Sequence, residues 1–459
     1  MIRSAVTVAM ATFMPSGSAV GRNAALKSTL PEAREGRLID RPVPGVSGVV
    51  ARTLAVLALL ATVNVRTSAQ QGPVTAFTGA TLVDGTDGAP VANATLLVRD
   101  GRVLAAGAAS RVAIPVGAQR TRLDGRVIIP GLINAHGHVN TPADLATYAA
   151  YGITTVFSLG GEPASVFAAR AGQNTPALDR ARVYLAGPVL TPATPAEART
   201  QVADVAAQRV DIVKIRVDDN LGTTVKMSPD VYRAVIAEAH GRGLRVAVHV
   251  YYLADAMDVL AAGADYIAHS VRDEPVNAAF VGALKANGAC YSPTLMREVS
   301  TFVYESTPSF FADSLFLAHA NRQWMSTLQE PARQDAMRTS VSAQRYKAQL
   351  PVANRNLKML SDAGIPIAMG TDTGPVGRFQ GYFELMELEH MVDAGLTPRQ
   401  AMAAATRDAA RCMHIDRDVG TLETGKWADF VVLDASPLER ISNVRRIRAV
   451  YVAGNLLPR

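Results

Sequence analysis

Short apolar segments separated by turn signals fill residues 74–127. The apolar segments lie at 76–78, 81–83, 94–98 and 102–106. Asp-Gly pairs punctuate them at positions 84, 87 and 100, and this dipeptide is typical of β-hairpin turns. The pattern predicts a small antiparallel β module in this region.

From about residue 128 the pattern changes, because apolar runs now alternate with helical segments. Eight runs are predicted strands: 127–133, 153–158, 182–187, 211–216, 244–249, 265–268, 289–292 and 365–369. In the helical segment 229–242, Ser228 is placed to cap the helix and Pro229 to occupy its first position. Thr397 begins a capping box at the start of another helix. This alternation predicts an α/β fold with a parallel (β/α)8 TIM barrel over residues 128–417.

Two further segments complete the predicted domain organisation. Residues 296–360 form a helical insertion before the last strand, and they carry six aromatic side chains: Phe302, Tyr304, Phe310, Phe311, Phe316 and Trp324. We interpret these as a helix-packing face, while a lid or an oligomer contact is the functional alternative. Residues 418–457 return to strand patterns and are expected to join residues 74–127 in one small β-sandwich domain formed from both chain ends.

Charge is unevenly distributed along the 459 residues, whose formal net charge is +6. Residues 1–69 carry eight basic and three acidic residues, so the remainder is nearly neutral. Basicity is therefore a property of the N-terminal segment, and no nucleic-acid partner is expected. The hydrophobic fraction of 49% is ample for a large core.

The segment 51–69 resembles a secretory signal peptide. Arg52 precedes the apolar run 54–61, and small residues follow it. The run is too short to span a membrane, so no membrane span is expected after signal removal. A signal peptide opens a chain, so we interpret residues 1–50 as a non-native or untranslated extension; a surface-lying apolar helix is the alternative reading of the run. We expect a periplasmic or secreted protein.

The two cysteines are too few for a disulfide framework, and we expect both to be buried thiols.

Two histidines stand at the end of the first predicted barrel strand. His136 and His138 follow the apolar run 127–133, and in an extended backbone residues i and i+2 point to the same side. Two neutral imidazoles placed in this way are able to hold one divalent cation, and zinc favours such nitrogen ligands.

Further polar residues end other predicted strands, where the active sites of such barrels lie. Lys214 interrupts the apolar strand 211–216, and burying an ammonium group is costly unless it is paired. One interpretation pairs it with an acid such as Asp372. In the other, its neutral amine captures carbon dioxide as a carbamate, an anionic ligand that bridges two metals. His249 and His269 end two successive strands and are predicted to bind a second cation.

Asp372 follows the last predicted strand. Its carboxylate is suited to ligate the first metal, hold the attacking water and pass the proton to the leaving group. The remaining histidines are interpreted as helix or surface residues: His240, His319, His390 and His414.

The ordered set His-x-His, strand Lys, His, His and Gly-Thr-Asp resembles the amidohydrolase superfamily. The stretches 127–138 and 420–431 both resemble its imidazolonepropionase-like branch. Imidazolonepropionases use one metal and lack the strand lysine. Lys214 therefore favours the binuclear members of the superfamily, which include Xaa-Pro dipeptidases, N-acyl-amino-acid hydrolases and mycotoxin amidases. Asn140 is a departure, because it stands near a position where these groups often carry another histidine.

The resemblance implies two divalent metal ions, usually zinc. The implied ligands are His136, His138, Lys214, His249, His269 and Asp372. The first two histidines and Asp372 would hold one ion and the last two histidines the other, with carboxylated Lys214 and a hydroxide bridging them. We therefore expect an exported hydrolase of amide bonds, acting on dipeptides or N-acyl amino acids, with Asp372 as the proton shuttle.

Five residues at or near the strand ends are candidate substrate contacts: Asn140, Arg216, Tyr251, Arg272 and Thr294. Arg272 or Arg216 is suited to receive a substrate carboxylate. Three alternatives stay open: a lactonase, a mononuclear cyclic-amide hydrolase or deaminase, and a metal-free binding or scaffold homologue. The sequence is compatible with a homo-oligomer and leaves the substrate and the metal undetermined.

Overall fold

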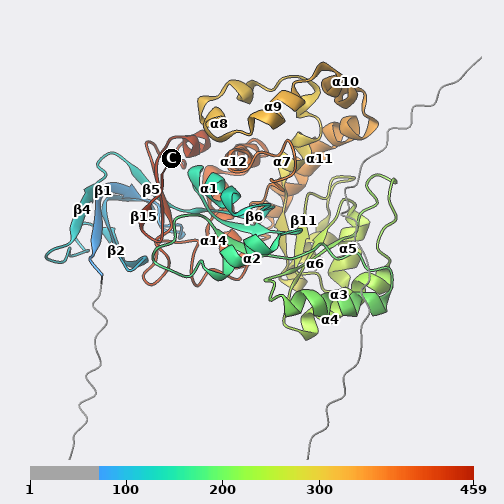
Figure 1. Cartoon of the computed structure of the whole chain (residues 1–459), viewed down its shortest axis with the longest axis horizontal. Coiled ribbons are helices and arrows are strands. Elements are labelled where there is room, and N and C mark those ends of the chain that lie inside the picture. Colours follow the sequence, from blue (N-terminus) through green and yellow to red (C-terminus); the bar gives the residue numbers. More distant parts are fainter. Residues whose placement is uncertain (1–71, 459) are drawn as a thin grey trace, which may run out of the picture. The chain divides into compact units, whose positions relative to one another are not determined.

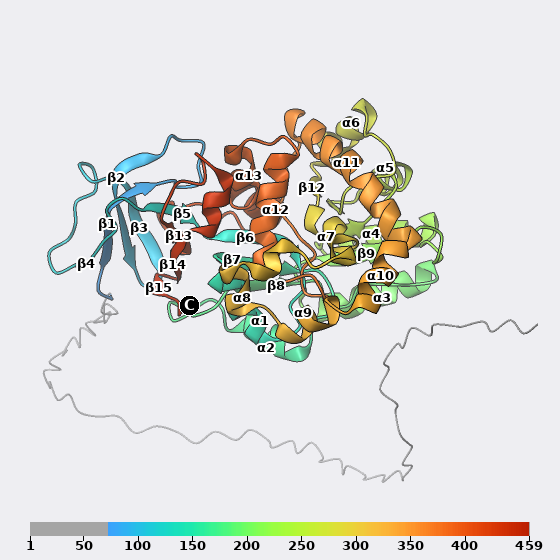
Figure 2. The same cartoon turned by 90° about the horizontal axis from the view of Figure 1, so that it is seen from above.

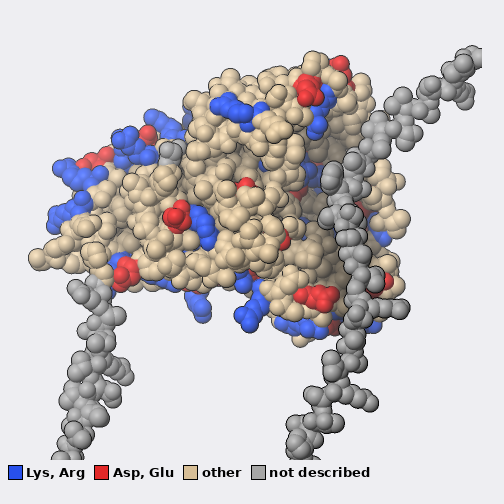
Figure 3. Space-filling model, viewed as in Figure 1, with Lys and Arg blue, Asp and Glu red and all other residues tan. Residues whose placement is uncertain are grey.

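The computed structural model describes residues 72–458. The predicted signal peptide 51–69 and the extension 1–50 lie outside the described residues. Among residues 72–458, no helix is both long enough and apolar enough to cross a membrane. On the face seen in Figure 3, basic and acidic side chains lie interspersed.

An eight-stranded sheet combines strands from both ends of the described chain (Figure 1). Its N-terminal strands are β1 (Thr75–Leu82), β2 (Val91–Arg99), β3 (Arg102–Ala108), β4 (Gln119–Arg122) and β5 (Val127–Pro130). Its C-terminal strands are β13 (Phe430–Leu433), β14 (Ile447–Val452) and β15 (Asn455–Leu456). The order is β15-β14-β13-β5-β1-β2-β3, with β4 parallel to β1. The ring of Phe430 stacks on Tyr451 at 4.5 Å and meets the edge of Phe77 at 4.9 Å, so aromatic packing joins the two ends.

The turn predicted at Asp100–Gly101 is confirmed, because both residues have positive φ and join antiparallel β2 and β3. The separate strands predicted at 76–78 and 81–83 are wrong, since they form the single strand β1. Its register shifts beside Gly79, which has a φ of 87°. A Cβ atom there would lie 2.2 Å from an oxygen of Asp124, so the chain needs glycine at this point.

Two parallel sheets form the rest of the strand framework. One has the order β6-β7-β8, built from β6 (Leu132–Gly137), β7 (Ile153–Ser158) and β8 (Arg182–Leu185). The other has the order β12-β11-β10-β9, built from β9 (Val213–Arg216), β10 (Val246–His249), β11 (Tyr266–Ala268) and β12 (Cys290–Ser292). Isolated parallel bridges continue the pairing between Leu190 and Ile215, Tyr291 and Ile367, and Gly137 and Thr373.

Two predicted barrel strands differ from the structure. The run 127–133 is divided at Gly131, with β5 in the eight-stranded sheet and β6 in a parallel sheet. A Cβ atom at Gly131 would lie 2.0 Å from Oγ1 of Thr154, so only glycine permits this close passage. The run 365–369 makes an isolated bridge rather than a strand. Pro366 has no N–H to donate there, which limits pairing.

Helices follow the parallel strands along the chain. They are α1 (Pro142–Ala150), α2 (Ala164–Ala171), α3 (Pro195–Ala207), α4 (Pro229–Gly241), α5 (Leu253–Ala261), α6 (Ala278–Asn287), α12 (Tyr382–Asp393), α13 (Pro398–Ala404) and α14 (Arg407–Cys412). The capping box at Thr397 is confirmed, as is Pro229 at the start of α4. Ser228 occupies the predicted N-cap position of α4, but its hydroxyl bonds to the Asp230 carboxylate instead of a backbone N–H.

A run of helices separates β12 from Ile367. It comprises α7 (Leu295–Ser300), α8 (Ser314–His319), α9 (Arg322–Leu328), α10 (Pro331–Thr339) and α11 (Val341–Asp362), with two short 3-10 turns. Helices α8, α9 and α10 lie together on one side of the parallel strands (Figures 1 and 2). Phe316 contacts Phe310 at 5.2 Å, and it contacts Phe379 beside α12 at 4.8 Å. These rings form a helix-packing face.

Cys290 and Cys412 form a disulfide, so the prediction of two buried thiols is wrong. Cys290 begins β12 and Cys412 ends α14, with Cα atoms 5.8 Å apart despite a separation of 122 residues in sequence. No local pattern reveals such a pairing, because only the tertiary fold brings these two elements together.

The disulfide closes a long loop, and we expect its removal to lower the free energy of unfolding. The double variant Cys290→Ser with Cys412→Ser should lose about 2–4 kcal/mol, because the unfolded chain regains the entropy of that loop. Urea unfolding of both proteins measures the difference, and reduced wild type is the control. Equal midpoints for oxidised wild type and the double variant would contradict this role.

Candidate metal centre

Four histidines, a lysine and an aspartate meet at the C-terminal ends of the parallel strands. His136 Nε2 and His138 Nε2 lie 3.4 and 2.8 Å from Asp372 Oδ1. Lys214 Nζ, on β9, lies 3.5 Å from His136 Nε2. The ring centroid of His269, after β11, lies 4.6 Å from that of His136 and 4.1 Å from that of His249, which ends β10. The structure therefore brings the six predicted ligands together.

His136, His138 and Asp372 form the most compact group, with three candidate ligand atoms within 4.8 Å of one another. His138 Nδ1 lies 3.0 Å from the carbonyl oxygen of Gly160, so the neutral ring donates there and directs Nε2 towards Asp372. His136 Nδ1 is buried without a hydrogen-bond partner. Imidazole and carboxylate ligands suit zinc, so these residues fit a divalent cation.

Burial favours the neutral form of three of the four imidazoles. It lowers the pKa of His136 to about 3 and holds the pKa values of His249 and His269 well below the ordinary value. Burial also opposes the charged form of His138, but the hydrogen bond and charge of Asp372 outweigh it and raise the pKa of this ring. Neutral imidazole is the form that binds a metal.

Lys214 is the cationic group that this cluster has to accommodate. Its side chain is 3% exposed, and burial lowers its pKa to about 7, although the charge of Asp372 opposes the shift. Within the described chain, Lys214 forms no ion pair shorter than 4.0 Å. The geometry therefore does not favour a lysine paired with Asp372. A neutral amine, which is the form that reacts with carbon dioxide, is accessible near neutral pH.

Two arginines that the sequence analysis missed surround Asp372. Arg378 donates to its Oδ2 atom, and Arg297 Nε lies 4.0 Å from the same oxygen. Burial would raise the pKa of Asp372, but the charge of Arg378 and hydrogen bonds from the histidines hold it well below the ordinary value. Arg378 comes only six residues after Asp372, so its closeness in sequence could have predicted that it lies beside this carboxylate. Arg297 comes from α7, which no motif links to the strand ends.

His249 also has a carboxylate partner that the sequence analysis missed. Its Nε2 atom lies 2.9 Å from Oδ2 of Asp218, which also accepts a hydrogen bond from Arg216 at 3.1 Å. Burial would raise the pKa of Asp218, but these partners lower it. A carboxylate in this position orients a metal-binding imidazole and fixes its tautomer.

The five candidate substrate contacts have different surroundings. Thr294 touches the cluster, because its Oγ1 lies 2.8 Å from Nδ1 of His269. Arg272 is fully buried and pairs with Glu298 at 2.9 Å, so a substrate carboxylate would have to compete with Glu298. Asn140 is exposed and donates a hydrogen bond to the carbonyl oxygen of Gly374. Arg216 is half-buried and donates to Asp218, and Tyr251 donates to the side chain of Gln349.

The other four histidines lie in or beside helices. His240, His319 and His390 belong to α4, α8 and α12, and His414 follows α14. His240 pairs with Asp265 at 2.9 Å, at the opposite ends of the strands from the cluster.

A buried carboxylate behind the cluster ties two ligand-bearing segments together. The Oε1 atom of Glu384, in α12, accepts hydrogen bonds from three side chains: Asn134 at 2.6 Å, Thr371 at 2.7 Å and Thr373 at 2.5 Å. Asn134 in turn accepts the backbone N–H of His136 at 3.0 Å, and the two threonines flank Asp372. Glu384 thus fixes the end of β6 relative to the Asp372 loop.

A second buried carboxylate, Glu387, lies one helical turn further along α12. It accepts the backbone N–H groups of Leu295 and Met296 at 2.8 and 2.6 Å, which anchors the start of α7. Burial raises the pKa of Glu384 to about 7 and that of Glu387 to about 8. Both carboxyl groups are buried on α12, but Glu384 holds the end of β6 and the Asp372 loop, whereas Glu387 holds the start of α7.

Comparison with known proteins gives matches over most of the chain. The model of the amidohydrolase family matches residues 127–457. Imidazolonepropionase of Deinococcus deserti is 26% identical over 386 residues, which cover 79% of this chain and 91% of that protein. Imidazolonepropionase of Geobacillus kaustophilus is 39% identical, but over 77 residues that cover only 17% of this chain and 18% of that protein.

Solved structures are similar over comparable lengths. A protein of Bifidobacterium longum described as a prolidase superposes with a TM-score of 0.69 at 26% identity, covering 85% of this chain and 95% of that one. An Xaa-Pro dipeptidase with methionine bound in its active site superposes with a TM-score of 0.67 at 18% identity, covering 84% and 100%. The second match shows a shared fold.

At pH 8, above the Glu384 pKa of about 7, we expect Glu384→Gln to weaken the binding of added zinc by about tenfold or more, because it removes the charged acceptor that aligns the two ligand segments. Competition with a chromophoric chelator measures the affinity. Glu387→Gln is the matched control, since it changes a buried carboxylate on the same helix that holds α7 instead, and it should keep the wild-type affinity. Equal zinc affinity in Glu384→Gln and wild type would contradict this role of Glu384.

We expect Glu387 to make stability depend on pH. Its ordinary pKa of 4.5 rises to about 8 in the folded protein. The folded state therefore keeps a proton that the unfolded chain releases, and the stabilisation present below about pH 4.5 is lost as the pH rises through about 8. Urea unfolding near pH 5 and near pH 8 should show a smaller difference for Glu387→Gln than for wild type. An unchanged difference would exclude Glu387 as the source.

Proposed function

The chain belongs to the amidohydrolase family and is a hydrolase of carbon–nitrogen bonds, and we propose that it cleaves the amide bond of dipeptides or N-acyl amino acids at the cluster described above. The observation that carries this proposal is Lys214. Its buried amine, with a pKa of about 7, lies among four imidazoles and 3.5 Å from His136. A carbamate on this amine would supply the anionic bridge between two cations that the resemblance implies.

In this proposal the six residues hold two divalent cations, with zinc the preferred metal for such ligands. His136, His138 and Asp372 would bind one ion, His249 and His269 the other, and carboxylated Lys214 both. Bound there, the cations would polarise the scissile carbonyl group and acidify water.

Asp372 is the proton carrier of the proposed reaction. It accepts the proton of the attacking water as the water oxygen bonds to the carbonyl carbon, and it delivers that proton to the amide nitrogen as the C–N bond breaks. The products are a carboxylic acid and an amine. Arg378 positions the Asp372 carboxylate beside the histidines. Burial alone would raise the pKa of Asp372, but the charge of Arg378 lowers it and so makes the carboxylate a weaker base.

A substrate carboxylate would find a cation beside the cluster. Arg297 is 7% exposed, and its Nε atom has no hydrogen-bond partner within the described chain. Burial alone would lower the pKa of Arg297, but the charge of Glu298 raises it, so the guanidinium stays charged. Arg272 and Arg297 both pair with Glu298, at 2.9 and 3.1 Å. Only Arg297 also lies 4.0 Å from Asp372 and keeps some exposure, so we propose Arg297 as the carboxylate contact. Dipeptides and N-acyl amino acids both carry the required group.

A mononuclear cyclic-amide hydrolase is the second candidate. It is favoured by the match to imidazolonepropionase of Deinococcus deserti, which covers 91% of that protein. The buried Lys214 argues for the binuclear reading instead. A substrate panel with dipeptides, N-acyl amino acids, lactones and cyclic amides separates these functions from a lactonase. A protein without bound metal or turnover would be the scaffold homologue.

We propose that the parallel strands close into a (β/α)8 barrel over residues 128–417, with a β-sandwich domain from residues 74–127 and 418–457. The isolated bridges at Leu190, Ile367 and Thr373 support closure, because each continues the parallel pairing between sheet edges. Export to the periplasm or the medium is likewise a proposal. The Cys290–Cys412 disulfide supports it, since such bonds persist in oxidising compartments.

We expect Lys214→Ala to bind fewer than the two zinc ions per chain proposed for wild type and to lower kcat/KM on the order of 100-fold or more, because the bridging ligand is lost. Metal analysis and dipeptide hydrolysis measure both effects. The exposed Lys285→Ala variant is the control. Reloading of metal-free wild type should also speed up with added bicarbonate. One metal per chain, with no change in Lys214→Ala, would refute the bridging role.

A further inference from the structure

A cavity of about 640 Å³ lies at the opposite ends of the strands from the candidate metal centre. Three of its lining residues mark this position, because Arg245 precedes β10, Asp265 precedes β11 and Cys290 begins β12. His249 and His269 stand at the other ends of β10 and β11. None of the six predicted metal ligands lines the cavity, so it is separate from the site of hydrolysis.

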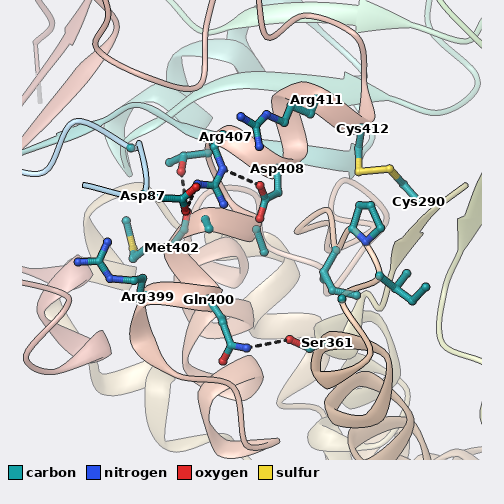
Figure 4. Close-up of a pocket in the computed structure, with 18 of the residues that line it drawn as sticks. Asp87, Cys290, Ser361, Arg399, Gln400, Met402, Arg407, Asp408, Arg411 and Cys412 are labelled. Carbon is teal, nitrogen blue, oxygen red and sulfur yellow. Dashed lines mark hydrogen bonds and ion pairs between the residues drawn. A yellow bond between two sulfur atoms is a disulfide. The ribbon is translucent and has the colours of Figure 1, made fainter. Parts of the chain in front are cut away.

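The walls come from segments far apart in the sequence. They are the loop after β1 around Asp87, the stretch 364–367, helices α13 and α14, and the disulfide (Figure 4). Much of the lining is apolar: Val83, Pro130, Ile365, Ile367, Leu396, Met402 and Leu438. A volume of this size with a largely apolar wall is typical of small-molecule sites, and the charged lining residues here are four arginines and three aspartates.

Arginines predominate among the charged lining residues. Arg407 lies between Asp87 and Asp408 and pairs with both carboxylates, so its charge is compensated (Figure 4). The third acid, Asp265, pairs with His240 at 2.9 Å and accepts the N–H of Val246 at 2.7 Å. The carboxylates of the cavity are therefore already engaged.

Among residues 72–458, three arginines of the cavity have no carboxylate partner in a close ion pair. Arg245 donates to the carbonyl oxygen of Cys412 at 2.5 Å, and Arg399 donates to that of Gly88 at 3.1 Å. Within the described chain, Arg411 makes no side-chain hydrogen bond and no ion pair shorter than 4.0 Å. Its charge does contribute to lowering the pKa of Asp87. Arg399 and Arg411 are both exposed, so an entering molecule is able to reach them. The cavity thus combines an apolar wall with two accessible arginines that form no close ion pair, although Asp87 interacts with both and Glu423 with Arg411 at longer range.

From this combination we propose that the cavity binds a small amphipathic carboxylate, with its hydrocarbon body on the apolar wall and its carboxylate on Arg411, while Arg399 of α13 adds positive charge at another part of the wall. Guanidinium groups bind carboxylates through charge-assisted hydrogen bonds, and burial of the hydrocarbon supplies the remaining affinity. A medium-chain fatty acid is the simplest molecule of this class. The proposal rests on the cavity alone and does not depend on the reaction proposed above.

Calorimetric titration of the purified, metal-bound chain with octanoate tests the proposal. We expect Arg411→Glu and Arg399→Glu each to weaken octanoate binding by at least tenfold, because each replaces an attracting charge with a repelling one. Arg417→Glu is the matched control, since Arg417 is exposed but does not line the cavity, and it should bind within about twofold of wild type. Octanol, with the same chain and no charge, should bind at least tenfold more weakly than octanoate.

Octanoate is also able to bind a metal, so the Lys214→Ala variant separates the two sites. Octanoate binding that persists in Lys214→Ala and is lost in Arg411→Glu supports the cavity. Binding that is lost in Lys214→Ala and kept in both arginine variants would place octanoate at the metal centre and overturn the proposal. The absence of octanoate binding to wild type, or equal binding by octanol, would overturn it as well.

Discussion

Burying a cluster of ionisable groups at the strand ends is the constraint on which the rest of this structure depends. An unpaired buried carboxylate or ammonium group is costly, so each has to be neutralised or paired. Arg378 and the histidines compensate Asp372, Asp218 orients His249, and Lys214 is shifted towards its neutral form. The chemistry proposed for this site follows from these compensations, because neutral imidazoles are able to bind a metal and a neutral amine is able to react with carbon dioxide, whereas their protonated forms are not.

The cluster is precise only because residues behind it are fixed. Asp372 has a φ of 56°, a left-handed conformation that a non-glycine residue adopts at some cost. Its neighbours Thr371 and Thr373 are held by the single buried oxygen of Glu384, which also holds Asn134 at the base of the histidine pair. Helix α12 thus contributes no ligand yet sets the distance between the ligands. The same helix anchors α7 through Glu387, and α7 brings Arg297 to the site.

The two ends of the parallel strands serve different purposes. The C-terminal ends collect the ligands, whereas the N-terminal ends carry the Cys290–Cys412 disulfide and the cavity beside it. The disulfide joins β12 to α14, so it ties the end of the helical region to the sheet.

The sequence by itself determined the strand and helix alternation, the presence of strands at both chain ends, and the identity of the residues at the strand ends. Each of these leaves a local trace, either a period of hydrophobic residues or a polar residue that ends an apolar run. Thr397 and the Asp100–Gly101 turn were predictable for the same reason. The division of the run 127–133 into two strands at Gly131 was not predictable. It depends on the Thr154 side chain lying against the backbone of Gly131, which is a tertiary contact.

Only the tertiary structure decided which groups compensate the buried charges. Glu384 comes from a helix whose sequence gives no sign of proximity to the predicted ligands, and Cys290 meets Cys412 across 122 residues. Asp218 and Arg297 do follow parallel strands, but the sequence does not show which group each of them pairs with. Arg272, which looked available for a substrate carboxylate, is occupied by Glu298. The physical reason is that electrostatic pairing and disulfide formation depend on distance in space, and hydrophobic periodicity fixes that distance within an element but not between elements.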